Sequence, residues 1–317
     1  MTNTIEKKIY YAHGKLLLTA EYFVLDGAKA LAVPTKFGQS LEIEANSGID
    51  NLTWKSFDSD KKTWFEGIFD SKSLKLLASE DEKTGSMLSK ILQTARSLNP
   101  QFSNFNCAIE THLTFPRQWG LGTSSTLIYN ISQLFGVNPY TLLNDTFGGS
   151  GYDIACAAVN TAIFYQLGES EPIVENAFFE PFFKDNLYFI YLGKKQNSRE
   201  GIARYRDKTK NIPPHREIGT SQYFDDISAI SDAFCTVFDL KSFEKLVFEH
   251  ERLVASVIEL PTVKSLYFTD YWGEIKSLGA WGGDFVLATS DRTLEETKVY
   301  FNKKGFDTIL QYSEMIL

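Results

Sequence analysis

The sequence predicts an α+β fold, arranged as a two-layer α/β structure in two domains. Strand-like runs rich in β-branched and aromatic residues alternate with stretches of helical periodicity in both halves of the 317-residue chain. Glycine-rich turns stand directly before two of the apolar helical stretches. A chain of this length can bury one large core or two smaller ones, and Pro172 and Pro181 interrupt the pattern near its middle. We therefore expect domains at 1–172 and 173–317.

The first domain is predicted to open with strands. Strand-like runs occupy residues 9–25, 30–34 and 40–45, with Gly, Asp and Pro between them. The next pattern is helical, over 85–98, and its apolar face is formed by Met87, Ile91, Leu92 and Ala95. Alternation over 105–115 then predicts a strand that leads to Pro116 and a glycine loop.

Helical patterns and strands continue to alternate after that loop. Apolar residues at helical spacing follow the small-residue turns at 120–122 and 148–151. The second domain is predicted to contain a strand at 186–193, helical segments within 221–258, a helix near 293–305 and a closing strand at 307–313.

The composition is that of an ordinary soluble globular protein. Hydrophobic residues make up 43% and charged residues 23%, and the formal charge of −8 argues against nucleic acid or an anionic membrane as partner. No apolar run has the length of a signal peptide core or a membrane span, so we expect a cytoplasmic protein. Three scattered cysteines do not form a disulfide framework, and the four histidines have no zinc-ligand spacing.

The stretch PRQWGLGTSS, residues 116–125, combines flexible backbone with three consecutive hydroxyl residues in front of a helix. A helix N-terminus has unpaired amide groups and a partial positive charge, and glycine lets an anion approach them closely. Phosphate binding and an ordinary capped helix are both consistent with this stretch. The stretch is neither a Walker A loop nor a G-x-G-x-x-G loop. Together with the turns at 148–151 and 279–283, it would form a phosphate cradle if the three met in space.

Four segments resemble the motifs of the GHMP kinases, the superfamily of galactokinase, homoserine, mevalonate and phosphomevalonate kinases. PRQWGLGTSS is similar to the central motif P-x-x-x-G-L-G-S-S-A, and Ser150-Gly151-Tyr152-Asp153 matches the Asp-bearing S-G-x-D segment. GKLLLTAEYFVL, which begins at Gly14, resembles the N-terminal motif, with Ala20 in place of a glycine. GAWGGD, residues 279–284, resembles the C-terminal glycine motif, with Trp281 in place of a glycine. The ordered set spans residues 14–285.

The resemblance implies a GHMP kinase fold, with an N-terminal S5-like domain and a C-terminal ferredoxin-like domain. It implies transfer of the γ-phosphoryl group of ATP, with Mg²⁺, to a small acceptor that bears a hydroxyl or a phosphate. The Glu-Tyr pair at 21–22, Asp284 and the stretch YLGKKQNSRE favour the mevalonate and phosphomevalonate kinases within the superfamily. The alternatives are a catalytically weak nucleotide-binding regulator on the same fold, a sugar or homoserine kinase, and an enzyme like diphosphomevalonate decarboxylase.

The same resemblance assigns roles to two charged residues. Asp153 corresponds to the carboxylate that accepts or orients the acceptor's proton, although an Asp before an apolar helix can equally serve as a helix cap. Lys15, in an otherwise apolar strand-like run, corresponds to the lysine that pairs with this carboxylate and keeps it ionised. The alternative for Lys15 is a solvated strand edge.

The remaining assignments concern ATP, metal and acceptor. The resemblance implies ATP contacts from Pro116, Trp119, Gly120, Leu121, Gly122, Thr123, Ser124, Ser125, Gly282 and Gly283. Ser124 is the expected Mg²⁺ ligand; a second, acidic ligand has no clear position, since Asp145 lies at the wrong spacing. The acceptor is expected to contact Glu21, Tyr22, Lys194, Ser198 and Ala280. Trp281 is expected either at the rim of the nucleotide site or in a core gap behind its loop. The assembly state stays open between a monomer and a homodimer.

Overall fold

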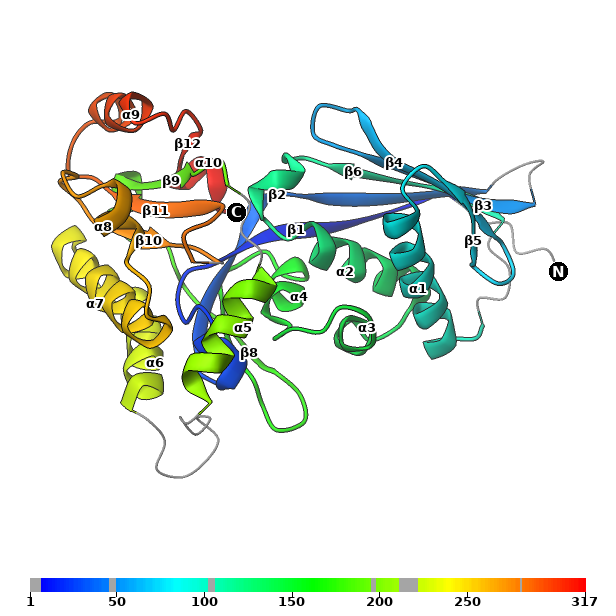
Figure 1. Ribbon diagram of the computed structural model, residues 1–317, viewed down its shortest axis with the longest axis horizontal. Coiled ribbons are helices and arrows are strands. Elements are labelled where there is room, and N and C mark those ends of the chain that lie inside the picture. The colour runs from blue at the N-terminus through cyan, green and yellow to red at the C-terminus, as the bar shows by residue number, and fades with distance from the viewer. Residues whose placement is uncertain (1–6, 46–49, 102–105, 195–197, 211–221, 280) are drawn as a thin grey trace. The chain divides into compact units, whose positions relative to one another are not determined.

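A computed structural model describes residues 7–45, 50–101, 106–194, 198–210, 222–279 and 281–317 (Figure 1). The chain forms two compact units that interleave along the sequence. The first unit consists of Met1–Gly14, Phe37–Arg117 and Leu121–Ala158. The second unit consists of Lys15–Lys36, Gln118–Gly120 and Val159–Leu317. Two long strands, β1 (Lys8–Leu17) and β2 (Ala30–Ala45), pair with each other and contribute residues to both units.

The first unit contains a mixed sheet in the order β5-β4-β3-β6-β2. Its further strands are β3 (Asn51–Phe57), β4 (Thr63–Asp70), β5 (Leu76–Ser79) and β6 (Cys107–Leu113). The pair β3–β6 is parallel, and β2–β6, β3–β4 and β4–β5 are antiparallel. Burial along β6 alternates between buried and half-buried residues, which gives this strand one face toward the core.

Four helices complete the first unit: α1 (Glu82–Leu98), α2 (Thr123–Phe135), α3 (Pro139–Thr146) and α4 (Tyr152–Ala157). In Figure 1 they lie together on one side of the sheet, and α2 packs against α1, α3 and α4. Their apolar faces meet the sheet in a core that includes Trp54, Ile91, Ile109, Ile131 and Phe135. The core fixes α2, and therefore the loop that precedes it, on the sheet.

The second unit contains a four-stranded antiparallel sheet in the order β10-β11-β9-β12. The strands are β9 (Leu187–Tyr191), β10 (Ile275–Ser277), β11 (Phe285–Thr289) and β12 (Ile309–Gln311). Helices connect β9 to β10, no helix of the described residues separates β10 from β11, and the helix α9 connects β11 to β12. These connections and the strand order are those of a ferredoxin-like domain. The larger sheet continues beyond β2: Ala30–Ala32 of β2 pair with β7 (Ile163–Gln166), which pairs in turn with β8 (Ile173–Asn176).

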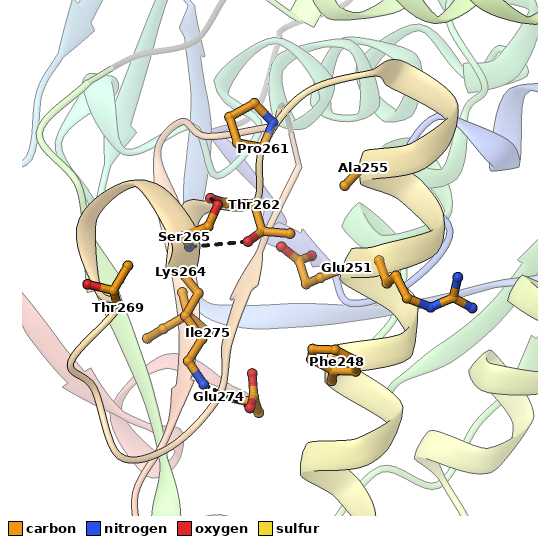
Figure 2. Close-up of a pocket in the computed structure, with 11 residues that line it drawn as sticks. Phe248, Glu251, Ala255, Pro261, Thr262, Lys264, Ser265, Thr269, Glu274 and Ile275 are labelled. Atoms are coloured by element: carbon orange, nitrogen blue, oxygen red, sulfur yellow. Dashed lines mark hydrogen bonds and ion pairs between the residues drawn. The ribbon is translucent and has the colours of Figure 1, made fainter.

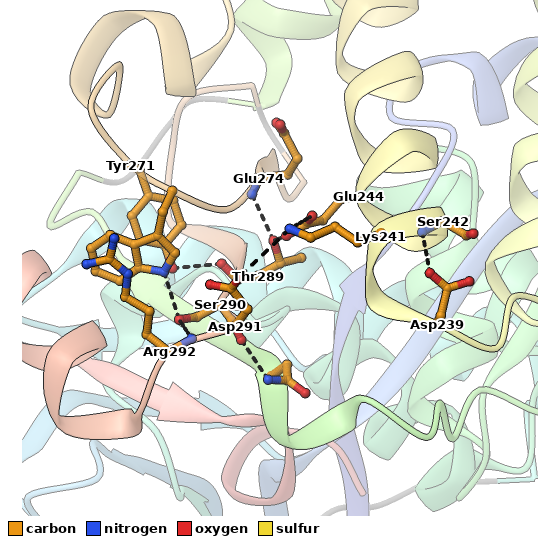
Figure 3. Close-up of polar contacts among 12 residues, drawn as sticks. Asp239, Lys241, Ser242, Glu244, Tyr271, Glu274, Thr289, Ser290, Asp291 and Arg292 are labelled. Carbon is orange, nitrogen blue, oxygen red and sulfur yellow. Dashed lines mark hydrogen bonds and ion pairs between the residues drawn. The ribbon is translucent and has the colours of Figure 1, made fainter.

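The helices of the second unit are α5 (Ser198–Thr209), α6 (Gln222–Phe234), α7 (Leu240–Ile258), α8 (Val263–Tyr267), α9 (Leu294–Lys303) and α10 (Tyr312–Met315). Polar contacts join the N-terminal part of α7 to the sheet (Figure 3): Thr289 Oγ1 donates to Glu244 Oε1 at 2.8 Å and accepts from the Glu274 amide at 2.8 Å. Among the helices of the described ranges, none is both long enough and apolar enough to cross a membrane.

The observed elements confirm most of the sequence prediction. The helix expected at 85–98 ends at Leu98 but begins at Glu82, because Asp81 caps it by accepting from the Thr84 amide. The strands expected at 30–34 and 40–45 are one continuous strand, β2, which passes through Pro34 and Gly38 without a break. Of the strand-like run 9–25, only the part up to Leu17 forms a strand, and its last residues belong to a short 3-10 turn, Phe23–Asp26. Cys107, Cys156 and Cys235, all within the described ranges, form no disulfide.

Candidate functional site

The N-terminus of α2 is open in the sense that its first amides have no side-chain cap among the described residues. Its N-cap is Gly122, in the left-handed region at φ 96°, and no side chain of the described part of the chain caps this helix. A glycine is required here because an L side chain rarely adopts this conformation. The first amides of α2 therefore combine unsatisfied donors with the positive end of the helix dipole, the arrangement that binds phosphate.

The hydroxyl residues at this N-terminus differ in their surroundings. Ser125 is buried and its Oγ donates to the Gly122 carbonyl at 2.8 Å. Thr126, also buried, donates through Oγ1 to Gln39 Oε1 at 2.8 Å. Ser124 is exposed. The first two hydroxyls serve the fold of the loop, and the third is presented to solvent.

Asp153 lies at a second glycine-led helix start, in the same unit. It occupies the first turn of α4, whose N-cap is Gly151 at φ 85°, and its Oδ1 accepts from the Ile154 amide at 3.1 Å. The pKa of Tyr140, on α3, is raised to about 12, mainly by burial and further by the nearby Cys156 and Asp153. Asp145, the other acid of this region, is exposed on α3. Since α2 packs against α4, the open helix end and Asp153 belong to neighbouring helices.

In the second unit, residues from three of the four motifs come together. Lys15 Nζ donates to the Gly120 carbonyl at 3.3 Å. A Cβ on Gly120 would lie 1.8 Å from Asp284 Oδ2, so only glycine permits the Asp284 carboxylate to approach this backbone. The start of the first glycine loop thus packs between the N-terminal and C-terminal motifs. Lys15 and Asp153 fall in different units, and their pairing stays a prediction.

The two tryptophans of the glycine loops have different environments within this unit. Trp119 is half-buried and meets Phe285 edge to face at 5.4 Å between ring centroids. Trp281 is only 7% exposed, and its indole N–H donates to the Pro261 carbonyl at 3.0 Å. Burial and this hydrogen bond favour the core position for Trp281 over the rim of a nucleotide site.

Glu21 of the N-terminal motif belongs to a buried ionic cluster that we call the Glu21 cluster: Glu21, His250, Glu251 and Lys276. Lys276 Nζ contacts Glu21 Oε1 at 2.7 Å and Glu251 Oε1 at 3.6 Å, and none of the four side chains is more than 4% exposed. Burial raises the pKa of Glu251 to about 8, against the lowering effect of Lys276. Burial and the charge of Lys276 hold the pKa of His250 well below its ordinary value. Burial also raises the pKa of Glu21, against the lowering effect of Lys276. At neutral pH Glu251 is therefore mostly protonated and His250 is neutral.

Sequence reasoning missed His250, Glu251 and Lys276. A sequence signal could have found the first of them. His250 falls in phase with the apolar stripe of α7 formed by Phe243, Val247 and Val254, whereas β10 reads Ile-Lys-Ser and gives no such signal for Lys276. A charged or titratable residue at such a position needs a buried partner.

The predicted acceptor contacts are distributed over several elements of the second unit. Tyr22 is 8% exposed, and its Oη accepts from the Trp281 amide at 3.0 Å. Lys194 is exposed, with Nζ 5.5 Å above the ring of Tyr267. Ser198 begins α5. Ala280 lies outside the described residues.

A cavity of about 500 Å³ lies in the second unit between α7, α8 and β10 (Figure 2). Glu251 points toward it from α7, and its wall includes Phe248, Pro261 and Ile275. An ion pair of 2.8 Å between Lys264 and Glu274 belongs to the same wall. None of the residues predicted for ATP or acceptor lines this cavity.

Across the described ranges, no three His, Cys, Asp or Glu side chains gather as ligands for a metal ion. The donor set at α2 suits a different kind of ion. A hard cation such as Mg²⁺ takes one or two protein oxygens and completes its shell with phosphate and water oxygens. The exposed Ser124 hydroxyl beside an open helix end fits that requirement.

Comparison with known proteins shows the fold. No family model matches the sequence, and no curated protein matches it. Solved structures match over nearly the whole chain: the Lin0012 protein from Listeria innocua has 14% identity and a TM-score of 0.71, with 96% of this chain and 97% of that chain covered. Mevalonate kinase from L. major, solved with R-mevalonate, has 14% identity and a TM-score of 0.66, covering 97% and 95%.

Phosphomevalonate kinase from Streptococcus pneumoniae, solved with phosphomevalonate and AMPPNP, has 15% identity and a TM-score of 0.66, and the match covers 96% of this chain and 99% of that chain. Galactokinase and mevalonate diphosphate decarboxylase structures match as well. All of these named enzymes belong to the GHMP kinase superfamily. The chain therefore has the GHMP kinase fold.

Proposed function

We propose that this protein transfers the γ-phosphoryl group of ATP to a small-molecule acceptor, with mevalonate and phosphomevalonate as the first candidates. The observation that carries the proposal is the open N-terminus of α2, where Gly122 leaves the first amides without a side-chain cap and Ser124 is exposed. A helix end of this kind, in a chain with the fold of an AMPPNP-binding kinase, supports a triphosphate site.

We assign the residues around this helix end different roles in binding Mg-ATP. Amides of Thr123 and Ser124 would donate to phosphate oxygens, and the Ser124 hydroxyl would be a ligand of the metal. The buried Ser125 keeps the loop in place through its bond to Gly122. Bound Mg²⁺ would neutralise the charge that develops on the transferred phosphoryl group.

Asp153 is the group to which we assign the acceptor's proton. A carboxylate can take a hydroxyl proton only if it lies within hydrogen-bond reach of the nucleophile. Its position in the first turn of α4, a helix that packs against α2, supports this assignment. Lys15, whose ammonium group reaches the Gly120 carbonyl, is assigned to favour the ionised carboxylate.

An acceptor of the mevalonate type is supported by the second unit. Mevalonate and its phosphate are anions, and Lys194 is exposed at the C-terminal end of β9, close to the start of α5 at Ser198. The solved neighbours that bind mevalonate and phosphomevalonate share the fold along nearly their whole length. We infer a carboxylate or phosphate group on the acceptor.

A product-detected screen tests this proposal. Purified protein with Mg-ATP is offered mevalonate, phosphomevalonate, homoserine and galactose, and phosphorylated products are identified by mass spectrometry. We expect phosphorylated mevalonate or phosphomevalonate. Phosphorylation of galactose alone would overturn the proposed acceptor. Absence of product with every acceptor, in protein that binds Mg-ATP, would favour a nucleotide-binding regulator instead.

A further inference from the structure

The turn Ala20–Tyr22 is strained at two of its three residues. Ala20 has φ 64°, and Tyr22 has φ 65° with ψ −43°. The Phe23 amide donates to the Glu21 carbonyl at 2.9 Å, which makes Tyr22 the centre of the rare γ-turn with positive φ. L-residues avoid both conformations because of contacts between Cβ and the backbone. Such strain persists only where the surrounding structure holds it.

Three buried groups hold this turn, one for each residue. His250 Nε2 accepts from the Ala20 amide at 2.9 Å, Lys276 Nζ donates to Glu21 Oε1 at 2.7 Å, and the Trp281 amide donates to Tyr22 Oη at 3.0 Å. The first contact differs from the others because it acts on the backbone. The angle φ describes rotation about the bond between the Ala20 nitrogen and its Cα, so an acceptor that fixes this N–H also restrains φ.

The imidazole of His250 has the protonation state that this contact needs. Burial and the nearby Lys276 charge lower its pKa, which leaves the ring neutral at ordinary pH. A neutral ring with its hydrogen on Nδ1 presents a lone pair at Nε2. Glu21 Oε2 also lies 3.2 Å from Nε2, but a nitrogen without a hydrogen cannot donate to it, so we assign the amide hydrogen bond.

We propose that His250 is a positioning residue: it holds Ala20 in the left-handed conformation and thereby sets where Tyr22 meets the Trp281 amide. His250 is 0% exposed and would act only through this turn. Tyr22 also stacks on Tyr205 at 5.7 Å between ring centroids, so a shift of the turn would separate Tyr22 from both partners. The part of the proposal that concerns acceptor binding rests on the proposed kinase function, whereas the part that concerns the turn does not.

The experiment compares His250→Leu with His250→Gln, each with Ala20 and with the Ala20→Gly substitution. Leucine removes the acceptor, whereas glutamine offers an amide oxygen at a similar distance along the side chain. Glycine adopts the left-handed conformation without strain, so Ala20→Gly should make the turn independent of His250. The first readout is amide hydrogen exchange at Trp281, whose N–H is bonded to Tyr22. The second readout is the melting temperature.

We expect His250→Leu to speed exchange at Trp281 by at least tenfold, and His250→Gln to leave it within about threefold of the parent protein. Ala20→Gly combined with His250→Leu should return exchange to within about threefold. The melting temperature should stay lowered in that double variant, because the amide at position 20 still has no acceptor. Unchanged exchange in His250→Leu, or no rescue by Ala20→Gly, would make His250 a core residue without a positioning role.

Acceptor kinetics separate this inference from the proposed function. His250→Leu should raise the acceptor KM about threefold to tenfold with a smaller change in kcat, and Ala20→Gly should reverse the KM effect. If the exchange pattern is as expected but no acceptor is phosphorylated by any variant or by the parent protein, the proposed function fails and the positioning role stands. A KM effect that Ala20→Gly does not reverse would overturn the link between the turn and the acceptor.

Discussion

Ser124 and Ser125 are neighbours in the chain with opposite environments. Ser125 is 2% exposed and bonded to the Gly122 carbonyl, whereas Ser124 is exposed at the open end of α2. A hydroxyl committed to the fold and a hydroxyl presented to solvent serve different purposes, although the sequence TSS does not distinguish them. The helical period places them on different faces of α2.

Substitution of each serine by alanine separates these roles. Ser125→Ala should lower the free energy of unfolding by about 1 kcal/mol, because one hydrogen bond to the Gly122 carbonyl is lost while the bond from the Thr126 amide remains. Ser124→Ala should leave unfolding unchanged and raise the Mg²⁺ concentration needed for half-maximal activity severalfold. Denaturant unfolding and Mg²⁺ titrations of ATP turnover provide the two measurements. Equal effects of both variants on the Mg²⁺ requirement would contradict the assignment of Ser124.

At the scale of the elements, the glycine turns differ in how closely other residues approach their backbone. Gly120 has φ 69°, and a Cβ there would lie 1.8 Å from Asp284 Oδ2. Gly148 has nearly the same φ, 68°, but a Cβ there would meet nothing within 4 Å. The two glycines therefore share the conformational requirement and differ in the space around them.

Alanine at these two positions gives a matched comparison. Gly148→Ala should lower the free energy of unfolding by about 1 to 2 kcal/mol, which is the strain of the left-handed conformation for an L-residue. Gly120→Ala should cost more, because the Asp284 carboxylate must also move, and ATP turnover should fall with it. Denaturant unfolding and turnover assays measure both effects. A second change, Asp284→Gly, should recover part of the stability lost in Gly120→Ala; no recovery would mean that the clash is not the cause.

Sequence patterns predicted elements better than they predicted the contacts between them. Helical periodicity located α1, because Ile91, Leu92 and Ala95 repeat at the helical spacing and are buried. Periodicity could not show that Lys276 of β10 meets Glu21, since 255 residues separate them. Nor could it show that Gly122, and not a serine, is the N-cap of α2: that depends on a backbone angle. The motif resemblance located the glycine loops, but it did not predict the buried partners of Glu21.

At the scale of the whole molecule, the Glu21 cluster makes stability depend on pH. Burial raises the pKa of Glu251 from the ordinary glutamate value to about 8. Between these two values the folded protein binds a proton that the unfolded chain has released. The contribution of Glu251 is therefore full below the ordinary pKa and is lost as pH rises to about 8. The lowered pKa of His250 acts oppositely, and its contribution is lost as pH falls below the ordinary histidine value.

Glu251→Gln isolates the first of these contributions, because glutamine does not titrate. The free energy of unfolding of the variant, relative to the parent protein, should increase between about pH 5 and pH 8 by on the order of a few kcal/mol and then level off. The His250 contribution largely cancels in this difference. Glu249→Gln, on the same helix with a side chain 46% exposed, is the control and should give a flat difference. A flat difference for Glu251→Gln as well would show that Glu251 is ionised throughout.

The division into two interleaved units could not be predicted from the order of the sequence patterns. The second unit takes Lys15–Lys36 and Gln118–Gly120 from the N-terminal half of the chain. The motif that begins at Pro116 is consequently shared between units, with Gly120 beside Lys15 in one and the helix α2 in the other. A sequence scan finds such a motif as one continuous stretch, because composition carries no information about which core each residue joins.

The proposed phosphoryl transfer from ATP depends most on Asp153, at the start of α4, as the group that takes the acceptor's proton. Asp153→Asn keeps the size of the side chain and removes the base, and Asp145→Asn on the neighbouring α3 is the matched control because Asp145 is exposed. The measurement is kcat with Mg-ATP and the best acceptor from the screen, together with the Kd for Mg-ATP. We predict that Asp153→Asn lowers kcat by roughly 10²- to 10⁴-fold with the Kd unchanged, and that Asp145→Asn leaves both unchanged. A folded Asp153→Asn protein with undiminished kcat would contradict the claim and leave Asp153 as a residue that stabilises the first turn of α4.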